Sequence, residues 1–284
     1  MAWDKQRQSF RAILDGDTCV NPASVHDPVS ARIAEDIGYE LGMLAGSVAS
    51  LSILGDPDLI LVTVTELAES VRRITRASGI PLLVDADHGF GNALNVRRTV
   101  QELEHAGAAG LTIEDTVLPR AFGQTGTQFV SLSEHVGKLR AAVQARTDPA
   151  LVLIGRTGAT VGGADDAVAR AKAYESTGID ALFFTALKTG SDLSAVASST
   201  RLPIILGGAV GEIGDNAALA RNRVRVRLLG HQPFAAAALA TYETLKALRD
   251  GTKPKDLKGL PSADFVNRTM RHDIMQRYIA EFLK

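Results

Sequence analysis

The chain has 284 residues, of which 45% are hydrophobic and 22% are charged, so it can bury one large core or two modest ones. Its formal net charge is −1, and neither a basic patch nor a polybasic run indicates binding to nucleic acid or to an anionic membrane. Cys19 is the single cysteine, which excludes an intrachain disulfide, and the sequence shows no signal core and no apolar run long enough for a membrane span. We therefore expect a soluble cytoplasmic protein.

Eight short apolar runs alternate with segments of helical pattern, at intervals that leave room for one strand, one helix and their loops. Strands that are apolar on both faces and separated by helices are typical of a parallel sheet. Eight such units in about 250 residues predict a (β/α)8 barrel of the TIM type over residues 1–249. A doubly wound sheet is the alternative, but it usually needs fewer strands. The predicted strands are Thr18–Ala23, Leu41–Leu44, Pro81–Val84, Gly110–Ile113, Leu151–Gly155, Ala181–Phe184, Pro203–Leu206 and Val224–Leu229.

Three predicted helices have a glycine where a helix commonly ends. These helices and their terminal glycines are Ser30–Ile37 with Gly38, Asn95–His105 with Gly107, and Asp165–Ser176 with Gly178.

Residues 250–262 are polar and contain both glycine and proline, which indicates a linker. An apolar stripe at near-helical spacing follows, and a helix of this kind has to cover an apolar surface on its own barrel or on a neighbouring one. The sequence therefore predicts a second unit, residues 250–284, made of a linker and an amphipathic helix. The stripe consists of Phe265, Met270, Ile274, Met275, Tyr278, Ile279 and Phe282.

The third predicted strand ends in the sequence Asp85-Ala-Asp87-His-Gly-Phe-Gly91-Asn92. Two carboxylates at i and i+2 leave a strand on the same side, and each raises the pKa of the other unless a positive charge lies between them. A hard divalent cation is the simplest such charge, and oxygen ligands suit Mg²⁺, with Mn²⁺ as a second possibility. A strand-to-helix turn with an Asx cap is the alternative interpretation.

Polar side chains also follow other predicted strands, and in a barrel of this type the chemistry gathers where the strands end. Because these ends meet at one mouth, we expect the side chains to lie close together. They are Ser47, with Gly46 beside it, after the second strand, Asp85 and Asp87 after the third, Glu114 and Asp115 after the fourth, Arg156 after the fifth, and His231 after the eighth.

This set of residues suits a small dianionic acid. Arg156 offers a fork of N–H donors to a carboxylate or to an enolate oxygen, and the N–H groups of Gly46 and Ser47 with the Ser47 hydroxyl can hold a second carboxylate. A cation near Asp85 would chelate a 2-keto acid and act as a Lewis acid on its carbonyl. The expected partner is therefore a small 2-keto dicarboxylic acid.

The chain resembles the phosphoenolpyruvate mutase/isocitrate lyase superfamily. The resemblance runs from Ser24 to His231, and its specific motifs are Leu44-Ala-Gly-Ser47, Asp85-Ala-Asp87-His-Gly-Phe-Gly91-Asn92, Leu111-Thr-Ile-Glu114-Asp115 and Ile154-Gly-Arg156-Thr.

The resemblance implies a role for each matching residue. Asp85 corresponds to the direct Mg²⁺ ligand, and Asp87 and Glu114 correspond to ligands that act through water. Arg156, His231 and Asp58 correspond to catalytic positions, and Gly46, Ser47, Arg156 and His231 to substrate contacts. The resemblance further implies a homotetramer, a dimer of dimers, in which the last helix swaps between subunits.

One loop departs from the lyases of this superfamily, which carry a Lys-Cys-Gly-His type sequence after the fourth strand. The corresponding segment here, residues 116–129, contains no Cys, Lys or His. Aldol-type cleavage needs a base and an acid, whereas decarboxylation of a β-keto acid needs no base, because the departing CO₂ leaves its electrons in a stabilised enolate that water or a weak acid can protonate.

The chain is most similar to the oxaloacetate decarboxylase branch of the superfamily, with which it shares residues 46–50 and 91–96 and Gly230-His231. This implies an oxaloacetate decarboxylase-like, metal-dependent carboxy-lyase that produces pyruvate and CO₂. It lacks the tyrosine of that branch after strand seven, where it reads Leu206-Gly-Gly-Ala-Val-Gly211. The alternatives are a C–C lyase or phosphonopyruvate-type enzyme of the same superfamily, and a non-catalytic homologue that binds 2-keto acids.

Overall fold

The computed structural model describes residues 3–158, 163–185, 187, 189–208 and 213–284. Its centre is one sheet of eight parallel strands in which each strand pairs with the next along the chain. This arrangement confirms the predicted (β/α)8 barrel. The strands are β1 (Ala23–Ser24), β2 (Gly42–Leu44), β3 (Leu82–Asp85), β4 (Gly110–Glu114), β5 (Val152–Gly158), β6 (Ala181–Thr185), β7 (Ile204–Gly207) and β8 (Val224–Arg227).

The barrel closes through Val20, which forms a parallel bridge with Val226 of β8. The N–H of Val20 donates to the carbonyl of Arg225 at 2.9 Å, and its carbonyl accepts from the N–H of Arg227 at 2.9 Å. The predicted first strand, Thr18–Ala23, is therefore wrong in its bounds. Pro22 has no N–H to donate, so the ladder stops there, and β1 begins only at Ala23, which faces Gly42 of β2.

Helices cover the outer surface of the sheet, and the three helices predicted to end near glycines lie within one or two residues of their expected bounds. Gly38, for example, follows α2 with a φ of 95°, a conformation that glycine adopts without strain. The helices around the barrel are α2 (Pro28–Ile37), α3 (Gly46–Ile53), α4 (Val64–Ala77), α5 (Ala93–His105), α6 (Leu132–Ala145), α7 (Gly163–Glu175), α8 (Gly190–Ser199) and α9 (Asn216–Arg221).

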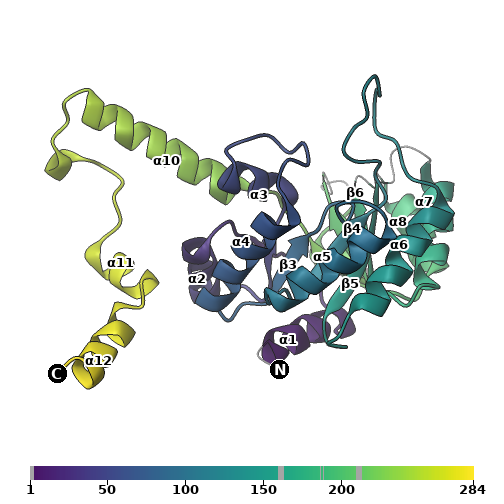
Figure 1. Ribbon diagram of the computed structural model, residues 1–284, viewed down its shortest axis with the longest axis horizontal. Helices are drawn as coiled ribbons and strands as arrows, with labels where there is room; N and C mark the ends of the chain where they lie inside the picture. The colour runs from purple at the N-terminus through teal and green to yellow at the C-terminus, as the bar shows by residue number, and fades with distance from the viewer. Residues whose placement is uncertain (1–2, 159–162, 186, 188, 209–212) are drawn as a thin grey trace.

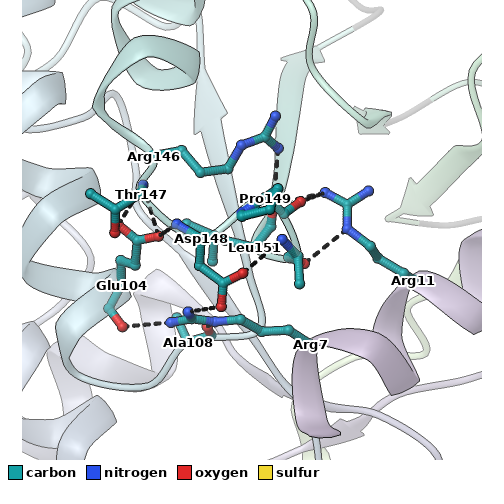
Figure 2. Close-up of polar contacts among 10 residues, drawn as sticks. Arg7, Arg11, Glu104, Ala108, Arg146, Thr147, Asp148, Pro149 and Leu151 are labelled. Carbon is teal, nitrogen blue, oxygen red and sulfur yellow. Dashed lines mark hydrogen bonds and ion pairs between the residues drawn. The ribbon is translucent and has the colours of Figure 1, made fainter. Parts of the chain in front are cut away.

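Helix α1 (Asp4–Asp15) lies across the end of the barrel where the strands begin, opposite the long loop that follows β4 (Figure 1). Arg7 of this helix is buried. Its guanidinium donates to the carbonyls of Ala108 and Glu104 at 3.0 and 2.6 Å and pairs with Asp148 at 2.5 Å. Figure 2 shows how these contacts tie α1 to the loops at this end, so the opposite end is left for the site.

The chain after β8 leaves the barrel (Figure 1). Helix α10 (Gln232–Arg249) has no buried residue, and beyond a short 3₁₀ turn the terminal stripe forms two helices, α11 (Ala263–Thr269) and α12 (His272–Phe282). The sequence predicted one helix here; the break lies at Arg271, which has a φ of 56° and pairs with Asp36 of α2. Within the described residues, no helix is long and apolar enough to cross a membrane.

Candidate active site

The ends of β3, β4 and β5 bring Asp85, Glu114 and Arg156 together. Asp115, which the sequence placed in the same group, requires a correction: it is buried behind the site, where it binds Tyr174 and Arg170. Nη1 of Arg156 donates to Oδ2 of Asp85 at 2.5 Å, and Nη2 lies 3.0 Å from Oε2 of Glu114. The register explains this convergence, because Glu114 faces Arg156 directly in the β4–β5 ladder. Arg156 lies within β5, which extends to Gly158, three residues beyond the prediction.

Asp85 is buried and held from several sides. Its Oδ1 accepts from the Thr112 hydroxyl at 3.1 Å and from the N–H of Asp87 at 3.2 Å. Burial by itself would raise the pKa of Asp85, but the charge and hydrogen bond of Arg156 outweigh it and hold the pKa below its usual value. Asp85 is therefore an ionised carboxylate in a fixed orientation.

Helix α3 directs its N-terminus at these carboxylates. The helix begins at Gly46 with no side-chain cap, so the N–H groups of its first turn have no partner in the helix, and the N–H of Gly46 donates to Oδ2 of Asp85 at 3.4 Å. Ser47 occupies the next position and is partly exposed. The geometry of this end of α3 suits a second anionic group.

Gly46 also leaves no room for a side chain. A Cβ at this position would lie 2.8 Å from Oδ1 of Asp87 and 3.5 Å from Oδ2 of Asp85. Because the α3 backbone passes so close to both carboxylates, the glycine sets the dimensions of the site.

Among Asp85, Asp87 and Glu114, Asp87 has the pKa that is raised the most. Its φ is 47°, an uncommon conformation for a residue with a side chain. Burial, followed by the negative charges of Asp85, Asp58 and Glu114, raises its pKa to about 9. Burial likewise raises the pKa of Glu114 to about 7, with Arg156 opposing and Asp85 adding to the rise. Four carboxylates therefore share one guanidinium.

This excess of negative charge fits a divalent cation. The donors are carboxylate oxygens, which hard cations prefer, and a cation would remove the repulsion that raises the pKa values of Asp87 and Glu114. In the described part of the chain, no three His, Cys, Asp or Glu side chains form a complete ligand cage. A cation at this place would therefore need water molecules to complete its ligand shell.

His231 lies directly before α10. Its Nδ1 is 2.9 Å from the Ser24 hydroxyl of β1, and burial lowers its pKa although Asp85 opposes this shift. The ring is therefore neutral near pH 7, with Ser24 fixing its orientation.

Asp58 lies on the loop between α3 and α4 and is largely exposed. Partial burial and the charge of Asp85 raise its pKa, while Arg156 opposes the rise. Its negative charge also raises the pKa of Asp87.

The loop after β4, residues 117–128, stands above the mouth (Figure 1). Thr116 and Phe129 pair at its base, and the N–H of Val117 donates to the carbonyl of Gln128 at 2.8 Å. The segment after strand seven that departs from the resemblance is described only to Gly208, and its residues 209–211 lie outside the described chain.

Three residues of the site were missed by the sequence interpretation. Thr112 bonds Asp85, Ser24 bonds His231, and the Phe183 ring lies 5.4 Å from the Arg156 guanidinium carbon. The alternation in β4, where Thr112 precedes Glu114 by two positions, could have indicated Thr112. Ser24 and Phe183 left no such signal, because their partners are distant in the chain.

Several known proteins are similar to this chain. The family model described as phosphoenolpyruvate phosphomutase matches residues 10–249. A protein named oxaloacetate decarboxylase from Rhodopseudomonas palustris (strain BisA53) is 58% identical over 284 residues, covering 100% of this chain and 98% of its own. A protein of the same name from Bradyrhizobium diazoefficiens is 60% identical over 272 residues, covering 95% and 94%. Among solved structures, a phosphonopyruvate hydrolase in complex with oxalate and Mg²⁺ superposes with a TM-score of 0.86 at 30% identity, covering 99% and 100%.

Proposed function

Because the chain belongs to the phosphoenolpyruvate phosphomutase family, we propose that it is a metal-dependent carboxy-lyase that converts oxaloacetate to pyruvate and CO₂. The names of the two similar proteins support this substrate. The observation that carries it is the cluster in which Asp85, Glu114 and Arg156 meet beside the N-terminus of α3.

In this proposal Asp85 would hold the cation directly, and Asp87 and Glu114 would hold it through water. Mg²⁺ suits these oxygen donors, and Mn²⁺ is the alternative. When bound, the cation supplies Lewis acidity at the 2-keto carbonyl.

The protein's own residues orient the substrate. The N–H groups of Gly46 and Ser47 and the Ser47 hydroxyl hold the C1 carboxylate; the N–H of Gly46 is shared with Asp85, which it contacts at the long distance of 3.4 Å. We assign Ser24 as the donor to Nδ1 of His231; in that tautomer the proton of the neutral ring lies on Nε2, from which it can donate to the C4 carboxylate. This placement fixes the C3–C4 bond that breaks.

Arg156 stabilises the charge that develops. As CO₂ leaves C4, the bonding electrons move toward the C2 oxygen, and the guanidinium lies among the carboxylates where that oxygen would bind. Its Nε–H is buried and has no partner among the described residues. An unpaired buried donor is costly, which supports a ligand oxygen in this position. The raised pKa of Asp58 suits it to return a proton to C3.

The test is to follow the loss of oxaloacetate and the formation of pyruvate with Mg²⁺ and with excess EDTA. We expect EDTA to abolish turnover above the spontaneous rate, and Asp85→Ala to do the same at saturating Mg²⁺. Asp56→Ala, on the exposed loop between α3 and α4, is the matched control and should retain activity. Equal rates with and without EDTA would contradict the proposal.

A second candidate function is that of a phosphonopyruvate-type enzyme. It is supported by the solved structure that superposes at 30% identity, which is a phosphonopyruvate hydrolase. A panel of oxaloacetate, phosphonopyruvate and methylisocitrate under the same conditions separates it and the C–C lyases from the decarboxylase. Binding of oxalate without turnover of any panel member would instead identify a non-catalytic 2-keto acid-binding protein.

We also propose that the protein acts in the cytoplasm as a homotetramer, a dimer of dimers. Residues 250–284 form a separate unit that contacts α2 of its own barrel through Arg271 and uses its exposed apolar face to pack on a neighbouring barrel. The support for the assembly is the exposed apolar surface of the helices after β8.

A further inference from the structure

A second ion-pair cluster lies behind the site, between the end of β4 and α7. Asp115, the residue after Glu114, is completely buried, and its Oδ2 accepts from the Tyr174 hydroxyl at 2.6 Å and from Nη1 of Arg170 at 2.9 Å. The same nitrogen of Arg170 lies 3.2 Å from the Tyr174 hydroxyl. This cluster is not part of the proposed chemistry, yet it is attached to the chain one residue away from Glu114.

The backbone of Asp115 joins three parts of the mouth. Its N–H donates to the carbonyl of Arg156 at 3.2 Å, and its carbonyl accepts from the N–H of Val130 at 2.8 Å. A shift of Asp115 would therefore move Glu114, the backbone of Arg156 and the returning end of the 117–128 loop together.

Arg170 also holds that loop directly. Its guanidinium carbon lies 5.1 Å from the centre of the Phe129 ring, and Phe129 closes the base of the loop opposite Thr116. Gly158 at the end of β5 makes room for this ring, since a Cβ there would lie 3.2 Å from its Cζ atom. One side chain on α7 thus contacts both the buried carboxylate behind the site and the base of the loop.

We propose that Arg170 is a positioning residue: by binding Asp115 and stacking on Phe129, it fixes Glu114 and Arg156 relative to the base of the 117–128 loop. Arg170 touches neither the cation nor the substrate and acts through Asp115. The measurement of kcat rests on the proposed function, whereas the measurements of oxalate binding and of proteolysis are independent of it.

The second ion pair of Arg170 offers a matched control. Its Nε pairs with Asp166 at 2.8 Å, one helical turn earlier on α7 and on the partly exposed side. If Arg170 only stabilised α7, loss of its ion pair with Asp166 and loss of its ion pair with Asp115 should have similar effects. If Arg170 positions the site, only the ion pair with Asp115 should affect kinetics and oxalate binding.

The experiment compares the wild-type protein with Arg170→Met, Arg170→Lys, Phe129→Leu and Asp166→Asn. For Arg170→Met we expect a loss of about 10- to 100-fold in kcat and in affinity for oxalate with Mg²⁺, measured by calorimetry, as for other residues that hold a metal-binding carboxylate in place. Arg170→Lys keeps the charge and should recover part of both. Asp166→Asn should match the wild type in both quantities.

Trypsin reports on the loop independently of activity. Arg120 lies exposed in the loop and offers a cleavage site. We expect faster cleavage after Arg120 in Phe129→Leu and in Arg170→Met, and wild-type cleavage in Asp166→Asn. Thermal unfolding identifies a variant that has lost its fold, and Phe129→Leu, near the surface, keeps the test informative if Arg170→Met does not fold.

The outcomes separate the two proposals. If the wild type turns over oxaloacetate, and the Arg170 and Phe129 variants match it in kinetics, oxalate binding and tryptic cleavage, the positioning role is overturned and the proposed function stands. Absence of oxaloacetate turnover, with oxalate binding still weakened by Arg170→Met, would support the positioning role and overturn the proposed substrate. Equal effects of Asp166→Asn and Arg170→Met would assign Arg170 a purely structural role.

Discussion

Gly46 shows how a single position sets the size of the site. Its backbone N–H bonds Asp85, and the space that a side chain would occupy is filled by the carboxylate of Asp87. The same residue therefore supplies a donor and permits the close approach of α3. In contrast, Gly137 of α6 has open space where a Cβ would lie.

We predict that Gly46→Ala displaces Asp87 and reduces kcat/KM for oxaloacetate by about 10- to 100-fold, since a displacement of about 1 Å can have this effect. Steady-state kinetics at saturating Mg²⁺ measure the loss. Gly137→Ala is the matched control, and it should leave kinetics unchanged and stabilise the fold by about 0.5–1 kcal/mol, because alanine is the better helix former. Equal kinetics for the two variants would show that Gly46 does not limit the site.

At the scale of elements, α1 holds the opposite end of the barrel together. Arg7 makes three contacts there, and its ion pair with Asp148 is nearly inaccessible to solvent. Glu104 accepts from the N–H groups of Thr147 and Asp148, so the ends of α5 and α6 join the same cluster (Figure 2). Arg7 and Asp148 are therefore buried charges, and leaving either one without its partner would destabilise the fold.

We predict that Arg7→Met lowers the free energy of unfolding by about 3–5 kcal/mol, because it leaves the buried charge of Asp148 without its partner. Urea unfolding followed by circular dichroism gives the value. Arg73→Met, which breaks an exposed pair with Glu69 on α4, should change stability little. If the two variants unfold alike, the α1 cluster contributes no more than a surface pair.

At the scale of the whole molecule, the segment after β8 differs from the barrel because many of its large apolar side chains are exposed. Several large apolar side chains of α10 and α12 are exposed, and a surface of this kind is typical of a protein interface. They include Leu239, Tyr242 and Leu245 of α10 and Met275, Tyr278, Ile279 and Phe282 of α12.

We predict a mass near four times 30.1 kDa by light scattering, and a smaller species for Leu245→Glu, because a charge on the exposed apolar face of α10 opposes burial between subunits. Lys253→Glu, in the polar segment after α10, is the control and should keep the mass of the wild type. A monomeric wild-type protein would contradict the proposed assembly.

Local patterns determined most of the barrel. The apolar runs, the terminal glycines and the acidic residues at strand ends are short-range features. They predicted eight strands, seven of them close to their observed bounds, and the grouping of Asp85, Glu114 and Arg156. The first strand was misplaced because its limits depend on which neighbour each residue pairs with: Val20 pairs with β8 and Ala23 with β2.

Chain periodicity and residue type by themselves determined the barrel, the acidic mouth and its suitability for a cation and a small dianionic acid. Only the tertiary structure decided that Arg156 bridges Asp85 and Glu114, that Ser24 orients His231, and that Arg170 reaches both Asp115 and Phe129. These contacts join residues far apart in the chain. Their partners are fixed by strand register and helix packing, which no local pattern specifies.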